Sequence, residues 1–470
     1  MAGIATIVFA IGILGFFWLD RDTDSETSSA LWIPVAWLLI AGSRMVSQWL
    51  QFPTPSNTAE MYVDGSPLDR DILTGLLVIG LIVLIRRASR VFTTLRANVP
   101  IVLFFLYCAA SILWSDFPGV ASKRWVKALG DLVMILIVLT DVDPRAAVKR
   151  LLARSGFVLI PLSVLLIKYY PDYGRAYHPW SWTPYYIGVT TDKNLLGMIC
   201  MVFGVGFAWR FLEAFHRGEG SRRVRPLIAH GAALGITFWL FWIVGSVTSL
   251  CCFLLAGVLM MMTSLPVVVR KPSIIHMFVV TTLCVAFFAL VLNVGPGLLQ
   301  TMGRDPTLTG RTEIWNEVLG LTGNPLLGTG FESFWMGERL QMMWSLHWWH
   351  PNEAHNGYLE IFLNLGWMGV ILLLLLMITG YRNAINVLRW DADGGKLRLA
   401  YILVAAVYSF TEAGFRMMNP VWIVFLLVTT KVPENRVHEE TELRTLSDTS
   451  DTEGYGDDQP YTADVCEEVV

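Results

Sequence analysis

The chain has 470 residues, of which 54% are hydrophobic and 16% are charged, and its formal net charge is −3. Soluble domains carry about 25% charged residues. The composition therefore excludes an ordinary soluble protein, and its many long apolar runs predict an all-α polytopic membrane protein.

Apolar runs follow one another along most of the chain. A helix needs about 20 apolar residues to cross the hydrocarbon core of a bilayer, and several runs are shorter. We therefore expect 12 or 13 transmembrane helices, with a break at Gly245-Ser246 between two of the runs. The runs cover residues 2–18, 31–50, 71–86, 99–115, 126–140, 153–168, 194–212, 226–243, 246–264, 274–293, 357–379, 399–412 and 419–430.

Arginine and lysine cluster in every second loop, beginning with Arg86, Arg87 and Arg90. Basic loops stay in the cytoplasm, so the pattern fixes an orientation. Lys123 and Arg124 are the main charges against it. The loops expected to face outward are 116–125, 169–193, 294–356 and 413–418.

The largest outward loop contains TLTGRTEIWNEVLG at residues 307–320, which predicts a short helix with Arg311 in its first turn. Cations are unfavourable at this end of a helix dipole, whereas a phosphate is favourable there. Arg311 is therefore a candidate ligand for a phosphate. The alternative is an arginine that reaches the membrane interface or pairs with Glu313 or Glu317.

The same loop ends at His355-Asn356, directly before the apolar run 357–379. Histidine is the side chain best suited to proton transfer near neutral pH, although it could also simply cap the helix. Glu360 follows one turn into the run, where a carboxylate is costly and usually functional or paired.

Aromatic residues crowd both large outward loops. The loop 169–193 places Arg175 and Lys193 among tyrosines and tryptophans, and the loop 294–356 adds Trp315 and further tryptophans. Flat rings with polar edges suit the faces of sugars. An aromatic belt at the membrane interface explains part of this enrichment.

Other chemistries receive less support. The spacing of His347, His350, His355 and Glu353 matches no standard zinc pattern, so we expect no metal and no cofactor. Two DxD strings, at 141–143 and 391–393, lie in the basic loops, where solvated loop charge is the simpler interpretation. No Walker A loop, GxSxG elbow or HExxH motif is present.

Several segments together resemble the O-antigen ligase and polysaccharide polymerase superfamily, in particular its exopolysaccharide-polymerase branch. They are LWSDFPGVASKRW (113–125), GVTTDKNLLG (188–197), TGRTEIWNEVLGLTGNPLLGTGFESFW (309–335) and HNGYLEIFLNLGWMG (355–369). The resemblance covers roughly residues 100–430. It implies a helical bundle of the membrane glycosyltransferase C type with a large outer loop.

The resemblance also implies a reaction. An oligosaccharide linked to undecaprenyl diphosphate would be moved to an acceptor hydroxyl, with inversion and without a metal. Arg311 and His355 fall on the family's arginine and histidine motifs, so Arg311 would hold the diphosphate and His355 would orient or deprotonate the hydroxyl. Ligases usually carry an arginine where this chain has Val247; Lys193 or Arg175 could supply that charge.

We accordingly expect three regions: N-terminal transmembrane helices at 1–98, a ligase- or polymerase-like membrane domain at 99–432, and an acidic disordered cytoplasmic tail at 433–470. The residues expected at the site are catalytic Arg311 and His355 and substrate-binding Arg175, Lys193, Asn194, Asn356, Glu360 and Trp315.

The preferred hypothesis is a polymerase on the outer face of a bacterial inner membrane. Its partners would be a lipid-linked donor, a glycan or lipid A core acceptor, membrane lipids and polysaccharide assembly proteins, but no nucleic acid. Three alternatives stay open at this point: an O-antigen ligase acting on lipid A core, a transporter of lipid-linked glycans, and a nucleotide-sugar glycosyltransferase that uses a DxD string.

Overall fold

The computed structural model describes residues 1–22, 25–51, 65–178, 182–217, 220–291 and 309–433. Contacts divide the chain into Met1–Lys431 and Val432–Val470, and almost all of the second unit, including the predicted acidic tail, lies outside the described residues. The first unit is a helical bundle with one small sheet of two strands, β1 (Arg175–Tyr177) and β2 (Pro184–Tyr186), in the described part of the chain. The prediction of an all-α polytopic membrane protein is confirmed.

Six helices in the described residues are long and apolar enough to cross a bilayer, or seven if the bent pair α6 and α7 counts as one span. They are α1 (Ala2–Leu19), α9 (Pro144–Tyr169), α11 (Lys193–Arg217), α12 (Gly220–Val244), α15 (Pro272–Val291) and α19 (Gly357–Trp390), and the bent pair is α6 (Ala88–Ala97) with α7 (Val99–Ala110).

The other predicted runs are also helical, but their helices are shorter or carry more charge. They are α2 (Trp32–Ala41), α5 (Pro67–Arg86), α8 (Pro118–Leu139), α13 (Val247–Met262), α20 (Ala392–Tyr408) and α21 (Pro420–Thr429). The run 31–50 is not one span, because the chain breaks between α2 and α3 (Val46–Trp49). Arg44 lies in this break and donates a hydrogen bond to the carbonyl of Tyr173.

Helix α11 occupies the core of the bundle. It contacts α9, α12, α13, α20 and α21, and its side chains Phe203 and Phe207 are fully buried. The predicted break at Gly245-Ser246 is present, since α12 ends at Val244 and α13 begins at Val247. The bundle thus brings the beginnings of α11 and α13 together, and Gly197 packs directly against Ser246.

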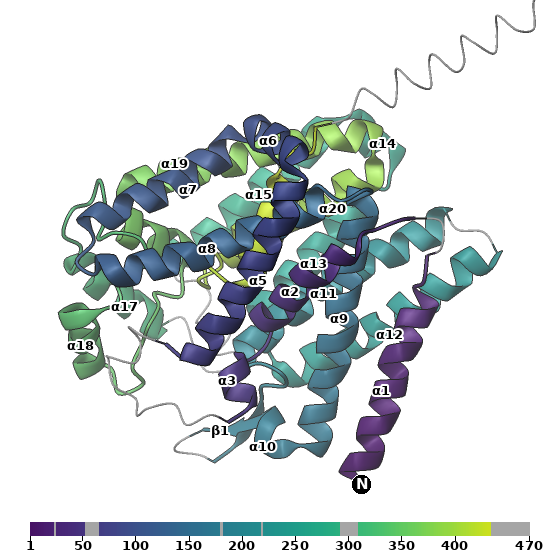
Figure 1. Cartoon of the computed structure of the whole chain (residues 1–470), viewed down its shortest axis with the longest axis horizontal. Coiled ribbons are helices and arrows are strands. Elements are labelled where there is room, and N and C mark those ends of the chain that lie inside the picture. Colours follow the sequence, from purple (N-terminus) through teal and green to yellow (C-terminus); the bar gives the residue numbers. More distant parts are fainter. Residues whose placement is uncertain (23–24, 52–64, 179–181, 218–219, 292–308, 434–470) are drawn as a thin grey trace, which may run out of the picture. The chain divides into compact units, whose positions relative to one another are not determined.

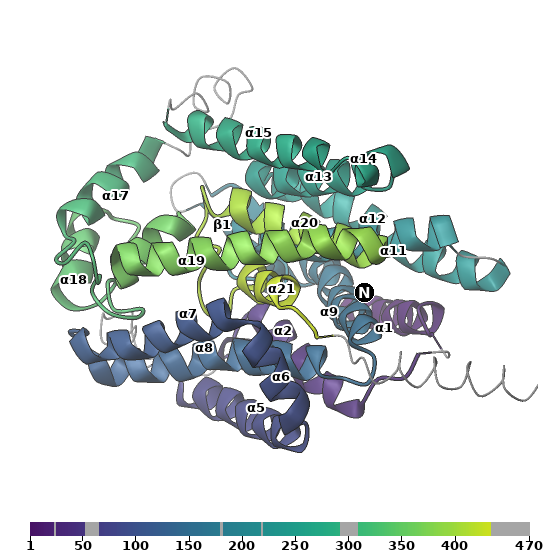
Figure 2. The same cartoon turned by 90° about the horizontal axis from the view of Figure 1, so that it is seen from above.

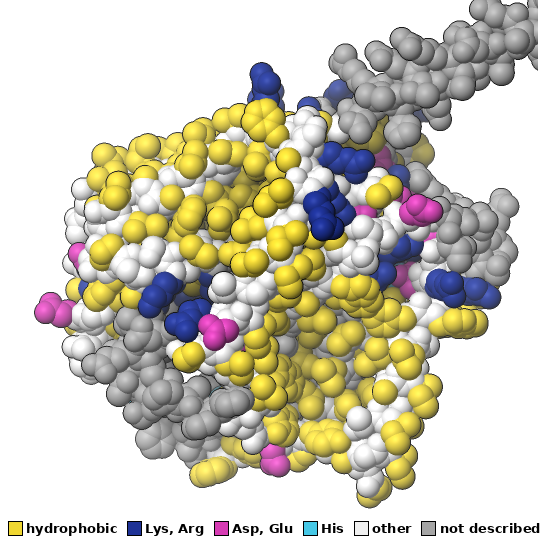
Figure 3. All heavy atoms as spheres, viewed as in Figure 1, with side chains coloured by type: hydrophobic (Ala, Val, Ile, Leu, Met, Phe, Trp, Pro, Cys, Tyr) yellow, Lys and Arg dark blue, Asp and Glu magenta, His cyan; other side chains and the backbone are white. Residues whose placement is uncertain are grey.

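Ion pairs tie the loops together in two separate groups. Loops predicted to be cytoplasmic pair with one another, as in Arg87–Asp141 at 3.3 Å and Arg145–Asp391 at 3.0 Å. Loops predicted to face outward also pair with one another, as in Arg339–Asp116 at 2.7 Å. Figure 3 shows a broad area of hydrophobic side chains with lysine and arginine gathered at its edges. The predicted orientation is therefore self-consistent, and which group faces outward stays a prediction.

The aspartates of the two DxD strings have local roles. Asp141 accepts hydrogen bonds from the backbone and hydroxyl of Ser28, and Asp391 caps α20 by accepting from Gly394. Asp393 pairs with Lys396 at 3.2 Å. The sequence suggested that these carboxylates are simply solvated. In the structure they instead take part in helix caps and ion pairs.

A break inside α19 shapes the end of the bundle that is predicted to face outward. Gly366 has φ 62° and ψ −166°, and a Cβ atom there would lie 2.3 Å from the carbonyl oxygen of Leu326. A broken helix leaves backbone groups that need partners. Trp367 donates to the carbonyl of Pro325 at 2.9 Å, and Thr329 donates to that of Leu363 at 3.1 Å. The segment GNPLLGTG (323–330) thereby fills the break and anchors the large outer loop.

Candidate functional site

The described part of the large loop that is predicted to face outward, residues 309–356, builds a small core of its own. Its predicted helix is present as α17 (Thr309–Gly320), followed by α18 (Gly337–Leu346), and both lie beside the start of α19 (Figures 1 and 2). Ile314 and Val318 are fully buried in this core together with Phe334 and Leu363. Leu319, the residue after Val318, is 48% exposed and lies outside this core. The packing of this small core holds α17 next to the loop that follows α20.

Arg311 points from α17 to this loop. Its Nη2 atom lies 2.9 Å from Oε1 of Glu412, and its Nη1 atom donates to the carbonyl of Thr411. Both side chains of the ion pair are largely buried, with 13% and 10% exposed. Arg311 therefore pairs with a carboxylate that is distant in sequence, and no described contact joins it to Glu313 or Glu317, which we had considered.

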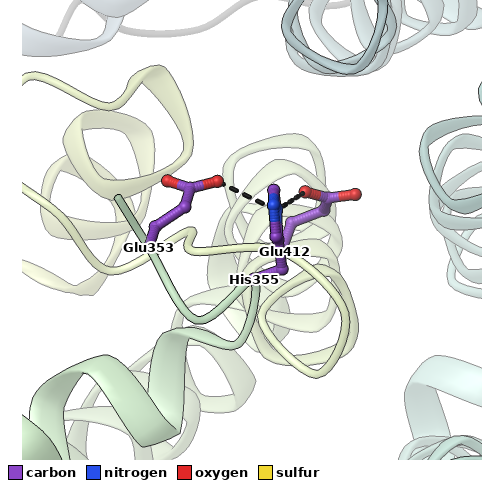
Figure 4. A group of neighbouring side chains, drawn as sticks. All are labelled: Glu353, His355 and Glu412. Carbon is purple, nitrogen blue, oxygen red and sulfur yellow. Dashed lines mark hydrogen bonds and ion pairs between the residues drawn. The ribbon is translucent and has the colours of Figure 1, made fainter. Parts of the chain in front are cut away.

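His355 lies between two carboxylates, as Figure 4 shows. Its Nδ1 atom is 3.0 Å from Oε1 of Glu353 and 3.4 Å from Oε2 of Glu412. The residue has φ 50°, a left-handed conformation that is uncommon for residues other than glycine. Glu412 thus contacts both Arg311 and His355, and the structure brings the two predicted catalytic residues into one cluster.

The carboxylates set the charge of this histidine. Burial would lower the pKa of His355, but hydrogen bonds with Glu353 and Glu412 outweigh it and raise the pKa to about 9. Burial would raise the pKa of Glu353, yet its hydrogen bond with His355 and the charges of His355 and Arg416 lower it to about 2. At neutral pH the pair is therefore an imidazolium and a carboxylate.

Arg416 continues the cluster on its other side. Its Nη1 atom lies 2.8 Å from Oε2 of Glu353, and its Nη2 atom lies 3.7 Å from Oε2 of Glu332. The result is an alternating row, Arg311–Glu412–His355–Glu353–Arg416–Glu332, which we call the outer ion cluster. Three cations and three carboxylates face one another, so their charges balance.

Three of the predicted substrate-binding residues instead hold the backbone beside His355. Glu360 is buried and accepts from the Ala354 amide at 2.5 Å and from Trp335 Nε1 at 2.9 Å. Trp315 donates to the Ala354 carbonyl at 2.7 Å. Asn356 caps α19 by accepting from Tyr358 and Leu359, both at 3.0 Å. These side chains position His355, because each satisfies backbone groups next to it.

The other three predicted residues lie outside the cluster. Arg175 donates a hydrogen bond to the carbonyl of Ile167 at 2.9 Å. The backbone amide of Asn194 donates to the Asp192 side chain at 2.7 Å, which caps the start of α11. No described contact joins Arg175, Lys193 or Asn194 to Arg311 or His355. The start of α11 nevertheless lies near the cluster, since Gly197 packs on Ser246 and Thr248 at the start of α13 hydrogen-bonds Thr411 at 3.4 Å.

The sequence did not single out Glu412, Arg416 or Glu332. Glu412 directly precedes the short loop 413–418 between two apolar runs, and Arg416 lies within it. A signal was available, because charged residues are rare at the outer ends of these runs and two of opposite sign stand four positions apart. Glu332 gave no comparable signal, since it lies among other polar residues of the large loop.

The group Glu353, His355 and Glu412 could hold a metal ion by distance alone, since their ligand atoms lie within 4.8 Å of one another. Each carboxylate, however, already faces a guanidinium group, Glu412 that of Arg311 and Glu353 that of Arg416. The donor set fits a network of ion pairs better than a divalent cation, which would have to displace those arginines from its ligands.

The tryptophans of the large loop divide into two kinds. Trp335 and Trp344 donate hydrogen bonds to Glu360 and to the carbonyl of Pro351, so they stabilise the loop. Trp348 and Trp349 are 66% and 40% exposed, and the ring of Trp349 lies 6.4 Å from that of His355. These two are the exposed tryptophans in the described part of this loop.

Comparisons with known proteins show what this chain is similar to. Residues 195–374 match the family described as O-Antigen ligase. The chain is also 26% identical over 287 residues to the exopolysaccharide production protein ExoQ of Rhizobium meliloti (strain 1021), an alignment covering 59% of this chain and 63% of that protein. The chain thus spans less than two thirds of this relative. The matched segment contains Arg311 and His355, whereas Glu412 and Arg416 lie beyond it. The predicted resemblance to the O-antigen ligase and polysaccharide polymerase superfamily is confirmed by these two matches, and the apolar helices make the chain a multi-pass membrane protein.

Proposed function

We propose that this protein polymerises oligosaccharides linked to undecaprenyl diphosphate on the outer face of a bacterial inner membrane. The observation that carries the proposal is the outer ion cluster, in which Arg311 and His355 share the carboxylate of Glu412. The resemblance to the superfamily and the relative's name, an exopolysaccharide production protein, support the same class of reaction.

In the proposed reaction the acceptor hydroxyl oxygen bonds to the anomeric carbon of the donor, and the bond from that carbon to the phosphate oxygen breaks. The hydroxyl proton passes to the departing diphosphate, the base that the reaction itself generates. Inversion follows from a single displacement at the anomeric carbon. Arg311 stabilises the leaving diphosphate by presenting a fixed cation where negative charge develops.

His355 orients the acceptor in this proposal. Its Nδ1 atom faces two carboxylates, so Nε2 is the atom that would contact substrate. A pKa of about 9 favours the imidazolium, which can donate a hydrogen bond but cannot accept a proton. Of the two roles that the sequence left open, orientation is therefore favoured over deprotonation. The reaction needs no metal, because the guanidinium groups supply the positive charge.

The test uses purified protein in nanodiscs with an undecaprenyl diphosphate-linked oligosaccharide. We expect longer glycans together with released undecaprenyl diphosphate, and a new linkage whose anomeric configuration is inverted. Arg311→Ala should abolish both products while the protein still inserts and purifies. The matched control Arg389→Ala removes an exposed arginine at the far end of α19 and should retain activity.

Two results would contradict the proposal. Glycans that lengthen without release of polyprenyl diphosphate would exclude this donor. Transfer to lipid A core, with no polymer formed from lipid-linked repeats alone, would favour the ligase alternative.

A further inference from the structure

A second cationic feature lies next to the outer ion cluster. A cavity of about 350 Å³ lies between α5, the beginning of α8 and the loop after α20. Five cationic side chains line it, against the two acidic side chains Asp69 and Glu332. The cations are Arg70, Lys123, Arg124, Lys127 and Arg416. The cavity therefore favours an anion.

The same cavity has an apolar wall. Leu73 and Leu77, one turn apart on α5, line it together with Val126. Beyond them α5 exposes a row of large apolar side chains, including Ile82 and Ile85 at 48% and 73%. Such a surface suits lipid chains. A ligand with an anionic head and an apolar tail would match both parts of the cavity.

Arg416 connects this cavity to the outer ion cluster. It lines the cavity and also pairs with Glu353, the carboxylate that contacts His355. Arg124 contacts Glu332, the other carboxylate residue that faces Arg416, by donating a hydrogen bond to its backbone carbonyl. Figure 3 shows lysine and arginine side chains gathered near the start of α5. The two cations that opposed the predicted orientation, Lys123 and Arg124, therefore belong to a site at the same end as the cluster.

We propose that this cavity binds the diphosphate of a polyprenyl-linked glycan, at a site separate from Arg311. A diphosphate carries negative charge on both phosphates and accepts several charge-assisted hydrogen bonds, which suits a wall of lysine and arginine. The proposal rests on the proposed function, because polymerisation uses two substrates of this kind: a donor that loses its diphosphate and an acceptor that keeps it.

Binding without turnover tests the cavity. The probe is undecaprenyl diphosphate, titrated into the full-length protein in nanodiscs. Lys123→Gln should weaken binding about tenfold, as expected for one lost charge-assisted hydrogen bond, and Lys123→Gln/Lys127→Gln should weaken it further. Lys123 is exposed, so the single variant should fold even if the double variant does not. The matched control Arg270→Gln/Lys271→Gln removes two exposed cations from another loop and should bind as wild type.

Three outcomes would overturn the proposal: unchanged affinity in the folded Lys123→Gln variant, equal binding of uncharged polyprenol, or full competition by phosphatidylglycerol. Because no transfer is required, a protein that binds the probe but forms no glycan would contradict only the proposed function. Where transfer occurs, Lys123→Gln should raise KM for the acceptor alone, because Arg311 is proposed to hold the diphosphate of the donor; a rise in KM for the donor alone would overturn the separate site.

Discussion

The pH dependence of transfer separates the two possible roles of His355. With a pKa of about 9, only about 1% of this histidine is neutral at pH 7, and forming that neutral state costs about 3 kcal/mol. If the imidazolium orients the acceptor, kcat/KM should be level from pH 7 to about 8.5 and fall above 9. If neutral His355 acts as the base, kcat/KM should instead rise about tenfold per pH unit up to that pKa.

Glu353→Gln shifts this profile by a predictable amount. The substitution removes the carboxylate 3.0 Å from Nδ1 and leaves Glu412 at 3.4 Å. A hydrogen bond between charged groups contributes about 1.5–3 kcal/mol, which corresponds to about one to two pKa units. The folded-state pKa of His355 should therefore fall, and the basic limb of the profile should move to about pH 7–8.

The assay is the initial rate of polymer formation in nanodiscs between pH 6 and 10, at donor concentrations below KM. Glu338→Gln, on an exposed position of α18, is the matched control and should keep the wild-type profile. A basic limb that stays near pH 9 in Glu353→Gln would show that this carboxylate does not hold the proton on His355. A rate that rises with pH in the wild type would refute the orienting role.

Three further outcomes are expected. Arg311→Lys should lower kcat/KM at least about tenfold, because lysine keeps the charge but lacks the planar fork that binds a phosphate through two nitrogen atoms and that here reaches Glu412 and the Thr411 carbonyl with separate nitrogens; a wild-type rate would show that charge alone is required. Gly366→Ala should lower the thermal unfolding midpoint strongly, since its Cβ would meet a carbonyl oxygen at 2.3 Å, whereas Gly75→Ala has open space and should not. A cysteine at exposed Ser345 should react with an impermeant reagent in intact cells and one at exposed Ser89 should not; the reverse result would invert the predicted orientation.

The sequence predicted the helices well because a bilayer imposes a simple rule on them. Each predicted apolar run contains a helix, and α17 begins within two residues of the expected position. The break in α19 was not predicted, since a glycine in an apolar run does not by itself indicate a left-handed conformation. Its cause is tertiary, because the backbone of residues 323–330 fills the break.

The site was predicted only in part, and for a related reason. Arg311 and His355 could be found from local pattern and resemblance, but Glu412 is 101 positions from Arg311 and 57 from His355. A local pattern cannot show such a pairing. Glu360 was interpreted as a substrate ligand because a carboxylate in an apolar run is costly and usually functional or paired. The structure pairs it within the loop, with the Ala354 amide and the Trp335 indole.

The balance of charge in the outer ion cluster complicates any single substitution at Arg311. Breaking a buried ion pair leaves an uncompensated charge and costs about 3–5 kcal/mol. Arg311→Ala could therefore abolish transfer either because the diphosphate loses its cation or because Glu412 is left unpaired beside His355. The two causes give the same result in a single variant.

The double variant Arg311→Ala/Glu412→Ala separates them. It removes both charges, so the cluster stays balanced, and its thermal unfolding midpoint should recover towards the wild-type value relative to Arg311→Ala. If Arg311 acts on the leaving diphosphate, transfer should remain abolished in this folded double variant. Recovery of transfer together with stability would mean that Arg311 serves only to neutralise Glu412, and the cation for the leaving group would then have to come from the other arginine of the cluster, Arg416.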